Sequence, residues 1–247
     1  MSGRWVLLKF GALACVCAAC GSFTTKSTSA PPSAPAPTPA ATAAPTSTAT
    51  PIPTATPIPT SNADVSTAVF PTGSGAARLT DPVAVATAFA TDYAGFVNPV
   101  VGPFERGDAR SGEVAIRPAA SGPVTTVLVR QIGSDGRWWV LGATTPAITL
   151  HSPTWFAPIS SPVTLKGISS AFEGTVQTQV REDGSDRPLG QGFVTGGSTG
   201  PGPFEGTLAF TKPTQKYGAL VLYTTSQEGA PVGHTREVMV IRVRFGS

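Results

Sequence analysis

The stretch "REVMVIRVRF" at residues 236–245 is the clearest strand pattern in the chain. Every second residue in it is large and apolar: Met239, Ile241, Val243 and Phe245. Arg242 and Arg244 fall between them. Because successive side chains of a strand point to opposite faces, the spacing predicts one face packed into a core and one that carries the arginines.

Six similar segments precede this strand, and Gly, Pro, Asp and Ser clusters bound them. They are "AITLHSP" (147–153), "PVTLKGIS" (162–169), "FEGTVQTQVRED" (172–183), "LGQGFVTG" (189–196), "FEGTLAF" (204–210) and "ALVLYTTS" (219–226). Seven short strands in about 100 residues is the number expected of an immunoglobulin-like β-sandwich. We therefore predict such a domain over residues 146–247.

A smaller α+β unit is predicted over residues 78–145. In "LTDPVAVATAFATDYAGFV" (79–97), Thr80 or Asp81 can cap a helix, and Pro82 suits its first turn. Three strands of an antiparallel meander should follow, in "GEVAIRP" (112–118), "PVTTVLVRQI" (123–132) and "RWWVLGAT" (137–144). A unit of this size has a marginal core, so we expect it to pack against its neighbour. The fold class is mainly β.

All three cysteines of the chain lie near the N-terminus, in "ACVCAACGS" (14–22). A basic start and a short apolar run precede them, as in a secretory signal. "CAACGS" (17–22) resembles a bacterial lipobox, which implies cleavage after Ala19 and acylation, such as palmitate, on Cys20. Cleavage before Cys15 and a plain secretory signal are the alternatives. We expect residues 1–19 to be a lipoprotein signal peptide.

Residues 20–63 are predicted to form a disordered tether rich in Pro, Thr, Ser and Ala, in which "TATPIP" occurs twice. Such a composition favours polyproline II and buries too little apolar surface to pack. Anchor and tether together predict a protein held by lipid on the extracytoplasmic face of the cell membrane. The formal net charge of +3 includes Arg4 and Lys9 of the signal, so the mature chain offers no basic face for nucleic acid.

The last 100 residues resemble the immunoglobulin-like domain of bacterial spore germination proteins. The segments that carry the resemblance are "SP" (152–153), "SPVTLKG" (161–167), "AFEGTV" (171–176), "PFEGTLAF" (203–210) and "LYTTSQEG" (222–229). The resemblance implies an extracytoplasmic β-sandwich without established catalytic residues. Within the repeated "FEG" we expect Phe172 and Phe204 to fill the core, and Glu173 and Glu205 to face solvent.

Residues suited to catalysis are few. The segment "ERGDARSGE" (105–113) contains Glu105, Asp108 and Glu113, which we interpret as part of a charged loop between helix and strand. His151 and His234 are far apart in the sequence and lack ligand spacing. No phosphate-binding loop, dinucleotide fingerprint or metalloprotease motif is present. We predict no enzyme activity, no metal and no cofactor.

Two functions from different classes remain. The first is a non-catalytic binding or scaffold module of the cell envelope, whose partner is an envelope protein or a glycan. Its contact surfaces would be "SPTWFAPI" (152–159), with Trp155 and Phe156 as aromatic anchors, and "GGSTGPGP" (196–203). These two aromatic residues could equally seal the junction between the folded regions. The second function is an envelope hydrolase with the carboxylates in a cleft at that junction.

Overall fold

The computed structural model of the protein describes residues 65–73, 79–185, 187–225 and 235–246. All of them belong to one unit of the chain. The predicted signal peptide, Cys20, the predicted tether (20–63) and His234 lie outside the described residues. None of the helices in the described ranges is long and apolar enough to cross a membrane.

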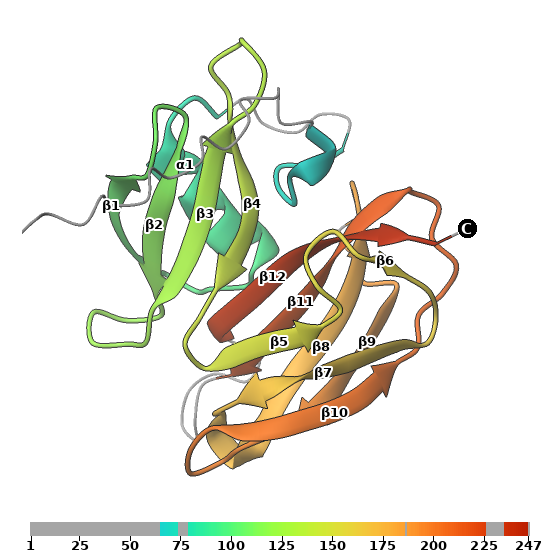
Figure 1. Cartoon of the computed structure of the whole chain (residues 1–247). Coiled ribbons are helices and arrows are strands. Elements are labelled where there is room, and N and C mark those ends of the chain that lie inside the picture. Colours follow the sequence, from blue (N-terminus) through green and yellow to red (C-terminus); the bar gives the residue numbers. More distant parts are fainter. Residues whose placement is uncertain (1–64, 74–78, 186, 226–234, 247) are drawn as a thin grey trace, which may run out of the picture. The chain divides into compact units, whose positions relative to one another are not determined.

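The predicted helix begins where the sequence places it. Helix α1 spans Pro82–Ala88, and the Ala84 N–H donates to Asp81 Oδ1 at 2.7 Å, so Asp81 is the cap. One π-helical turn, Phe89–Tyr93, continues the helix. Gly95 follows with φ of +79°, a conformation that favours glycine. The apolar side of the helix lies against strands of the small α+β unit, which we call the first region (Figure 1).

Four strands follow the helix, one more than expected (Figure 1). They are β1 (Val100–Arg106), β2 (Ser111–Arg117), β3 (Thr125–Gln131) and β4 (Trp138–Thr144). The sequence pattern does not reveal β1, because Gly102 and Pro103 interrupt its alternation. Proline is tolerated there since β1 is an edge strand with a register shift between Val101 and Phe104. The charged segment 105–113 is therefore the end of β1, a turn and the start of β2, rather than a loop after the helix.

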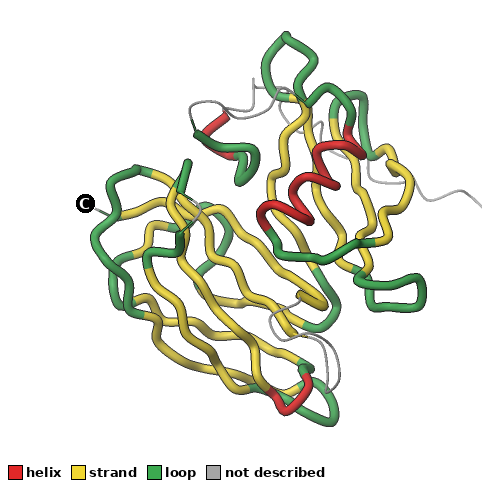
Figure 2. The backbone as a smooth tube through the Cα atoms, turned by 180° about the vertical axis from the view of Figure 1, so that it is seen from behind, coloured by secondary structure: helices red, strands yellow, loops and turns green. Residues whose placement is uncertain are grey.

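All seven strands predicted for the C-terminal region are present, and an eighth of two residues joins them. The eight are β5 (Ile148–Ser152), β6 (Pro158–Ile159), β7 (Val163–Ser169), β8 (Thr175–Glu182), β9 (Gly190–Thr195), β10 (Gly202–Leu208), β11 (Tyr217–Thr225) and β12 (Thr235–Phe245). Strands dominate the described chain in Figure 2, which confirms the mainly β class.

In the described residues these strands form two sheets, in which every pairing is antiparallel except that of β6. The larger has the order β1-β2-β3-β4-β12-β11-β8-β9, with β6 parallel to β12, and the smaller has the order β10-β7-β5. Val240 of β12 pairs with Ala143 of β4, so strands of the first region and of the sandwich share one sheet. The expected packing of the small α+β unit against its neighbour therefore includes backbone pairing.

Strands β11 and β12 are covered on both faces. Side chains on one face pack with those of α1 and β1–β4 in a core that contains Phe89, Trp138 and Val240. The other face joins β7, β8 and β10 in the sandwich core, which contains Leu165 and Phe204. Burial on both faces explains why "ALVLY" (219–223) is a continuous apolar run.

Arg242 differs from its neighbour Arg244, which is exposed. Because the second face of β12 is also covered, Arg242 is only 1% exposed. Its guanidinium forms two bonds to the Asp183 carboxylate, at 2.5 and 2.6 Å. Its Nε donates to the Ser66 carbonyl at 2.7 Å, which ties residues 65–67 to β12. Residues 65–73 precede residue 78, where the folded region was predicted to begin, and Ala68 within them is fully buried.

The two "FEG" segments occupy different environments. Phe204 lies in β10 and is 3% exposed, as predicted. Phe172 is 47% exposed, so the prediction that it fills the core is wrong. It lies in a 3-10 turn, Phe172–Gly174, in which Glu173 adopts φ of 54°, and β8 begins only at Thr175. A turn has no fixed inward face, so strand alternation cannot place this ring.

Candidate functional site

The segment 152–159, which carries the predicted aromatic anchors, is fastened to the edge of the sandwich by its backbone. The Phe156 N–H donates to the Arg242 carbonyl at 2.6 Å, and the Arg244 N–H donates to the Ala157 carbonyl at 3.0 Å. Strand β6 then pairs with Arg244 and Phe245 of β12. Phe156 itself adopts φ of 62°, an unusual conformation for a bulky residue. The loop is therefore held in one conformation by its hydrogen bonds to β12.

Three rings form a row on this segment and on β11, which we call the aromatic ledge (Trp155, Phe156 and Tyr217). The Trp155 and Phe156 ring centroids are 5.3 Å apart. Phe156 stacks on Tyr217 at 5.7 Å with 29° between the ring planes. Trp155 is 51% exposed, whereas the other two rings are half-buried. Trp155 is thus the solvent-facing end of the ledge, and Phe156 and Tyr217 form its half-buried end.

Cationic side chains surround the aromatic ledge. Arg244 lies 5.5 Å from the Phe156 centroid, and Lys216 lies 5.3 Å from the Tyr217 centroid. Within the described ranges neither of these two exposed cations forms an ion pair. Arg242 also faces the Tyr217 ring, at 5.3 Å, but Asp183 neutralises it. The ledge therefore combines an exposed apolar ring with two available positive charges.

A family comparison identifies the domain that carries this ledge. Residues 147–230 match the immunoglobulin-like domain of bacterial spore germination. The match confirms the resemblance drawn from "AFEGTV" and "PFEGTLAF". The comparisons with curated proteins and with solved structures gave no match. An immunoglobulin-like domain of this kind indicates a binding or scaffold module.

The Phe156 ring stacks on Tyr217 of β11, the backbone of segment 152–159 bonds to β12, and half of Trp155 faces solvent. Sequence reasoning missed Tyr217, Lys216 and Arg244 as members of the site. The alternation of β12 did place Arg244 away from the sandwich core, but nothing in the sequence linked it to a loop 88 residues earlier.

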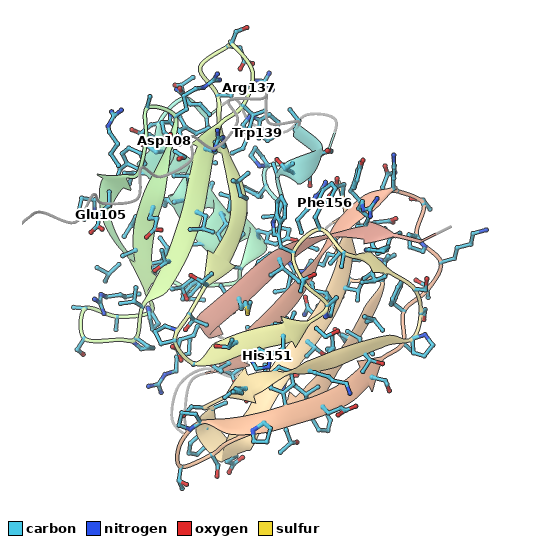
Figure 3. All side chains as sticks on the ribbon, in the orientation of Figure 1. Glu105, Asp108, Arg137, Trp139, His151 and Phe156 are labelled. Carbon is cyan, nitrogen blue, oxygen red and sulfur yellow. The ribbon has the colours of Figure 1, made fainter. Side chains whose placement is uncertain are left out.

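The carboxylates that the hydrolase hypothesis invokes lie in the β1–β2 hairpin and its turn. Glu105 and Glu113 are directly opposite each other in the β1–β2 ladder. Figure 3 shows Glu105 and Asp108 at this hairpin. Strand β1 is the outermost strand of the sheet, and β2 and β3 separate it from the β4–β12 pairing. The pair is therefore not in a cleft at the junction of the two regions, where the hypothesis required it.

Asp108 is fixed by local hydrogen bonds in the turn between β1 and β2. The Arg110 N–H donates to its Oδ1 at 2.7 Å and is the main reason why the pKa of Asp108 lies below its ordinary value. Arg130 lies 3.9 Å away. Asp108 therefore stays ionised and structures the turn, which does not suit a general acid.

The other titratable groups noted in the sequence have structural roles or stand alone. His151 is exposed on β5 (Figure 3). Burial tends to raise the pKa of Glu182, but hydrogen bonds from the Thr214 and Gln215 N–H groups outweigh it, so the pKa is lowered. Asp183 pairs with Arg242. Within the described residues no three His, Cys, Asp or Glu side chains cluster in a way that could hold a metal ion.

Proposed function

We propose that the protein is a lipoprotein tethered to the extracytoplasmic face of the cell membrane, which serves as a non-catalytic binding module of the cell envelope. The observation that carries the binding role is the exposed Trp155 ring, which packs at a tilt against Phe156 in a segment held by backbone bonds to β12. Rigid aromatic anchors bind partners at low entropic cost, because little freedom is lost on contact. The immunoglobulin-like family match supports a binding or scaffold role.

The partner is expected to bring negative charge to the ledge. Arg244 and Lys216 flank the exposed ring, and a partner that neutralises them gains both electrostatic attraction and aromatic contact. An envelope protein with an acidic surface and an anionic glycan both meet this requirement. Binding should therefore weaken as the salt concentration rises.

Trp155→Ala tests the binding role. The variant should capture envelope material at least tenfold less well than the wild type in pull-downs from envelope extracts. Its melting temperature should change little, because half of the ring is exposed and contributes little to the core. Phe193→Ala is a matched control, since that ring is 64% exposed on β9 and lies outside the ledge. Equal capture by Trp155→Ala and wild type would refute the role of the ledge.

Cys20→Ala tests the anchor separately. One acyl chain gives a membrane association constant of only about 10⁴ M⁻¹, whereas two or more make release negligible. The variant should move to the soluble fraction or remain uncleaved, as membrane fractionation and immunoblotting would show. If Cys15→Ala releases the protein instead, the proposed cleavage site is wrong.

A further inference from the structure

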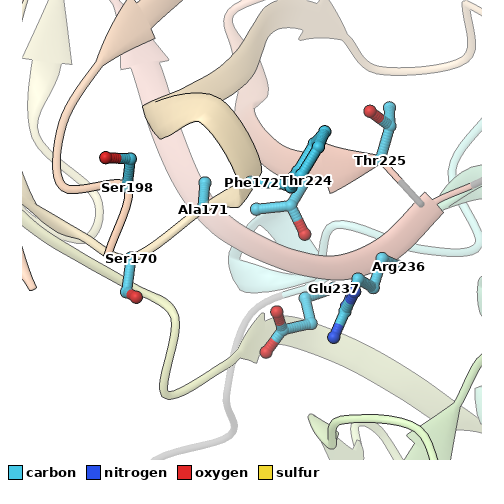
Figure 4. Close-up of a pocket in the computed structure, with 8 residues that line it drawn as sticks. All are labelled: Ser170, Ala171, Phe172, Ser198, Thr224, Thr225, Arg236 and Glu237. Atoms are coloured by element: carbon cyan, nitrogen blue, oxygen red, sulfur yellow. The ribbon is translucent and has the colours of Figure 1, made fainter. Parts of the chain in front are cut away.

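A cavity of about 210 Å³ opens at one end of the β-sandwich. The turn after β7, the connection after β9, the end of β11 and the start of β12 all contribute to it (Figure 4). The lining side chains that bear on its chemistry are Ser170, Phe172, Ser198, Thr224, Arg236 and Glu237. The cavity shares no residue with the aromatic ledge, so a ligand here is a function beyond the one proposed above.

Two polar residues occupy positions in this cavity where the strand pattern calls for apolar ones. Thr224 and Glu237 are direct partners across the β11–β12 ladder. In β12, Met239 and Ile241 continue the same inward face toward the sandwich core. Thr224 is 3% exposed and Glu237 is 7% exposed. Polar side chains at core positions lower stability, so their presence points to a function.

The hydrogen bonds of these two side chains are incomplete. Thr224 Oγ1 is buried, and among the described residues it has no hydrogen-bond partner. Glu237 Oε1 accepts a bond of 2.7 Å from Thr145 Oγ1, and a carboxylate can accept about four. Figure 4 shows the Thr224 hydroxyl directed toward Glu237 and Arg236. Free donor and acceptor capacity is thus concentrated in one cavity.

The Phe172 ring supplies an apolar surface beside these polar groups. Although it is large and apolar, it is 47% exposed and lines the cavity. The turn that carries it includes Glu173 at φ of 54° and Gly174 at φ of 71°, both in the left-handed region. A Cβ on Gly174 would lie 2.7 Å from the Gly196 carbonyl oxygen, so the turn is also packed closely against the next connection.

The combination of charges disfavours a ligand that carries a single charge of either sign. An ammonium group would suit Glu237 and the Phe172 ring, but Arg236 would repel it. An anion would suit Arg236, but the Glu237 carboxylate would repel it. A sugar hydroxyl both donates and accepts, so it can bond to Glu237, Arg236 and Thr224 together. The C–H face of a sugar ring can pack on Phe172.

We propose that this cavity binds a neutral saccharide ring, with Glu237, Arg236 and Thr224 bonded to its hydroxyls and Phe172 against its apolar face. A ring of about a dozen non-hydrogen atoms should bind with a Kd on the order of 1 mM. Longer glycans that contain such a ring would enter the cavity through one residue.

The full chain should be titrated with glucose, galactose, mannose and N-acetylglucosamine, by saturation-transfer NMR and calorimetry. Choline tests whether the cavity prefers a cation, and glucose 6-phosphate tests whether it prefers an anion. At least one neutral sugar should bind, whereas choline and the phosphate should bind at least tenfold more weakly. Failure of all four sugars to bind, or preferential binding of choline or the phosphate, would overturn the proposal.

Variants locate the binding. Phe172→Ala, Thr224→Val and Glu237→Gln should each weaken sugar binding at least tenfold. Thr224→Val is nearly isosteric and removes a hydroxyl that has no partner among the described residues, so its melting temperature should not fall and lost binding cannot be ascribed to unfolding. Phe193→Ala and Trp155→Ala should bind the sugar as the wild type does, and the latter separates this site from the ledge. Unchanged binding by both Phe172→Ala and Thr224→Val would refute the site.

Discussion

Removal of the Asp183 carboxylate should destabilise the protein more than removal of the arginine it neutralises. Arg242 is 1% exposed, and Asp183 supplies its two shortest bonds, at 2.5 and 2.6 Å. In Asp183→Ala the partners left to the guanidinium among the described residues are the Ser66 carbonyl at 2.7 Å, the Gly218 carbonyl at 3.4 Å and the Tyr217 ring. The two carbonyl groups are dipoles and the tyrosine ring is a quadrupole, so none of them carries a net negative charge. The buried cation is therefore left without a counter-charge.

The expected cost follows from that geometry. Loss of one partner of a buried ion pair costs about 3–5 kcal/mol. The whole free energy of unfolding of a domain is about 5–15 kcal/mol. At about 2–4 °C per kcal/mol for a fold of this size, the melting temperature should fall by about 6–20 °C. Arg242→Met should cost less, because it removes the buried charge too, and the Asp183 side chain is 26% exposed and can be solvated.

Urea and thermal unfolding of Asp183→Ala, Arg242→Met and a surface control would test this reasoning. Glu205→Ala is the control, because the Lys166–Glu205 pair has an N–O distance of 2.7 Å but its side chains are 52% and 64% exposed. An exposed pair contributes about 0–1 kcal/mol. An Asp183→Ala cost no larger than that of Glu205→Ala, or a larger loss of stability in Arg242→Met than in Asp183→Ala, would refute the role of the buried charge.

Three further predictions concern packing and ionisation. Phe204→Ala should cost about 3–5 kcal/mol in urea unfolding, whereas Phe172→Ala should stay within about 1 kcal/mol because its ring is 47% exposed; equal costs would contradict the burial seen here. Gly167→Ala should cost about 1–3 kcal/mol in the same assay, since its Cβ would lie 2.5 Å from the Phe204 ring; a neutral change would refute the close packing. Burial raises the pKa of Tyr93 to about 12, above the ordinary 10.0, although Arg181 opposes the shift. Absorbance at 295 nm should therefore show one tyrosine that ionises near pH 12, and Tyr93→Phe should remove it; the stability that Tyr93 contributes is present below pH 10 and lost as the pH rises to 12.

Local patterns determined the strands and the start of the helix. The alternation of β12 and the turn residues between the other segments were sufficient for seven strands and for the sandwich, because strand formation has a period that the sequence displays. Thr80 and Asp81 before Pro82 were sufficient to place the start of the helix, since capping involves neighbours in the sequence, and the structure identifies Asp81 as the cap. Strand β1 could not be predicted in this way, because it contains Pro103. A proline is tolerated in a strand at the edge of a sheet, and the position of a strand in the sheet is not a local property of the sequence.

The sequence alone also predicted that Trp155 and Phe156 would be aromatic anchors, but it could not tell an interface from a sealed junction. Only the tertiary structure determined that Tyr217 and Arg244 join them, because those contacts connect residues distant in the sequence. The same holds for Arg242, which alternation assigned to the face away from the sandwich core. The sequence shows which side chains share a face of a strand, whereas the packing of the whole chain decides what covers that face. That second face of β12 is buried against the first folded region, so the buried Arg242 required a counter-charge, and Asp183 provides it.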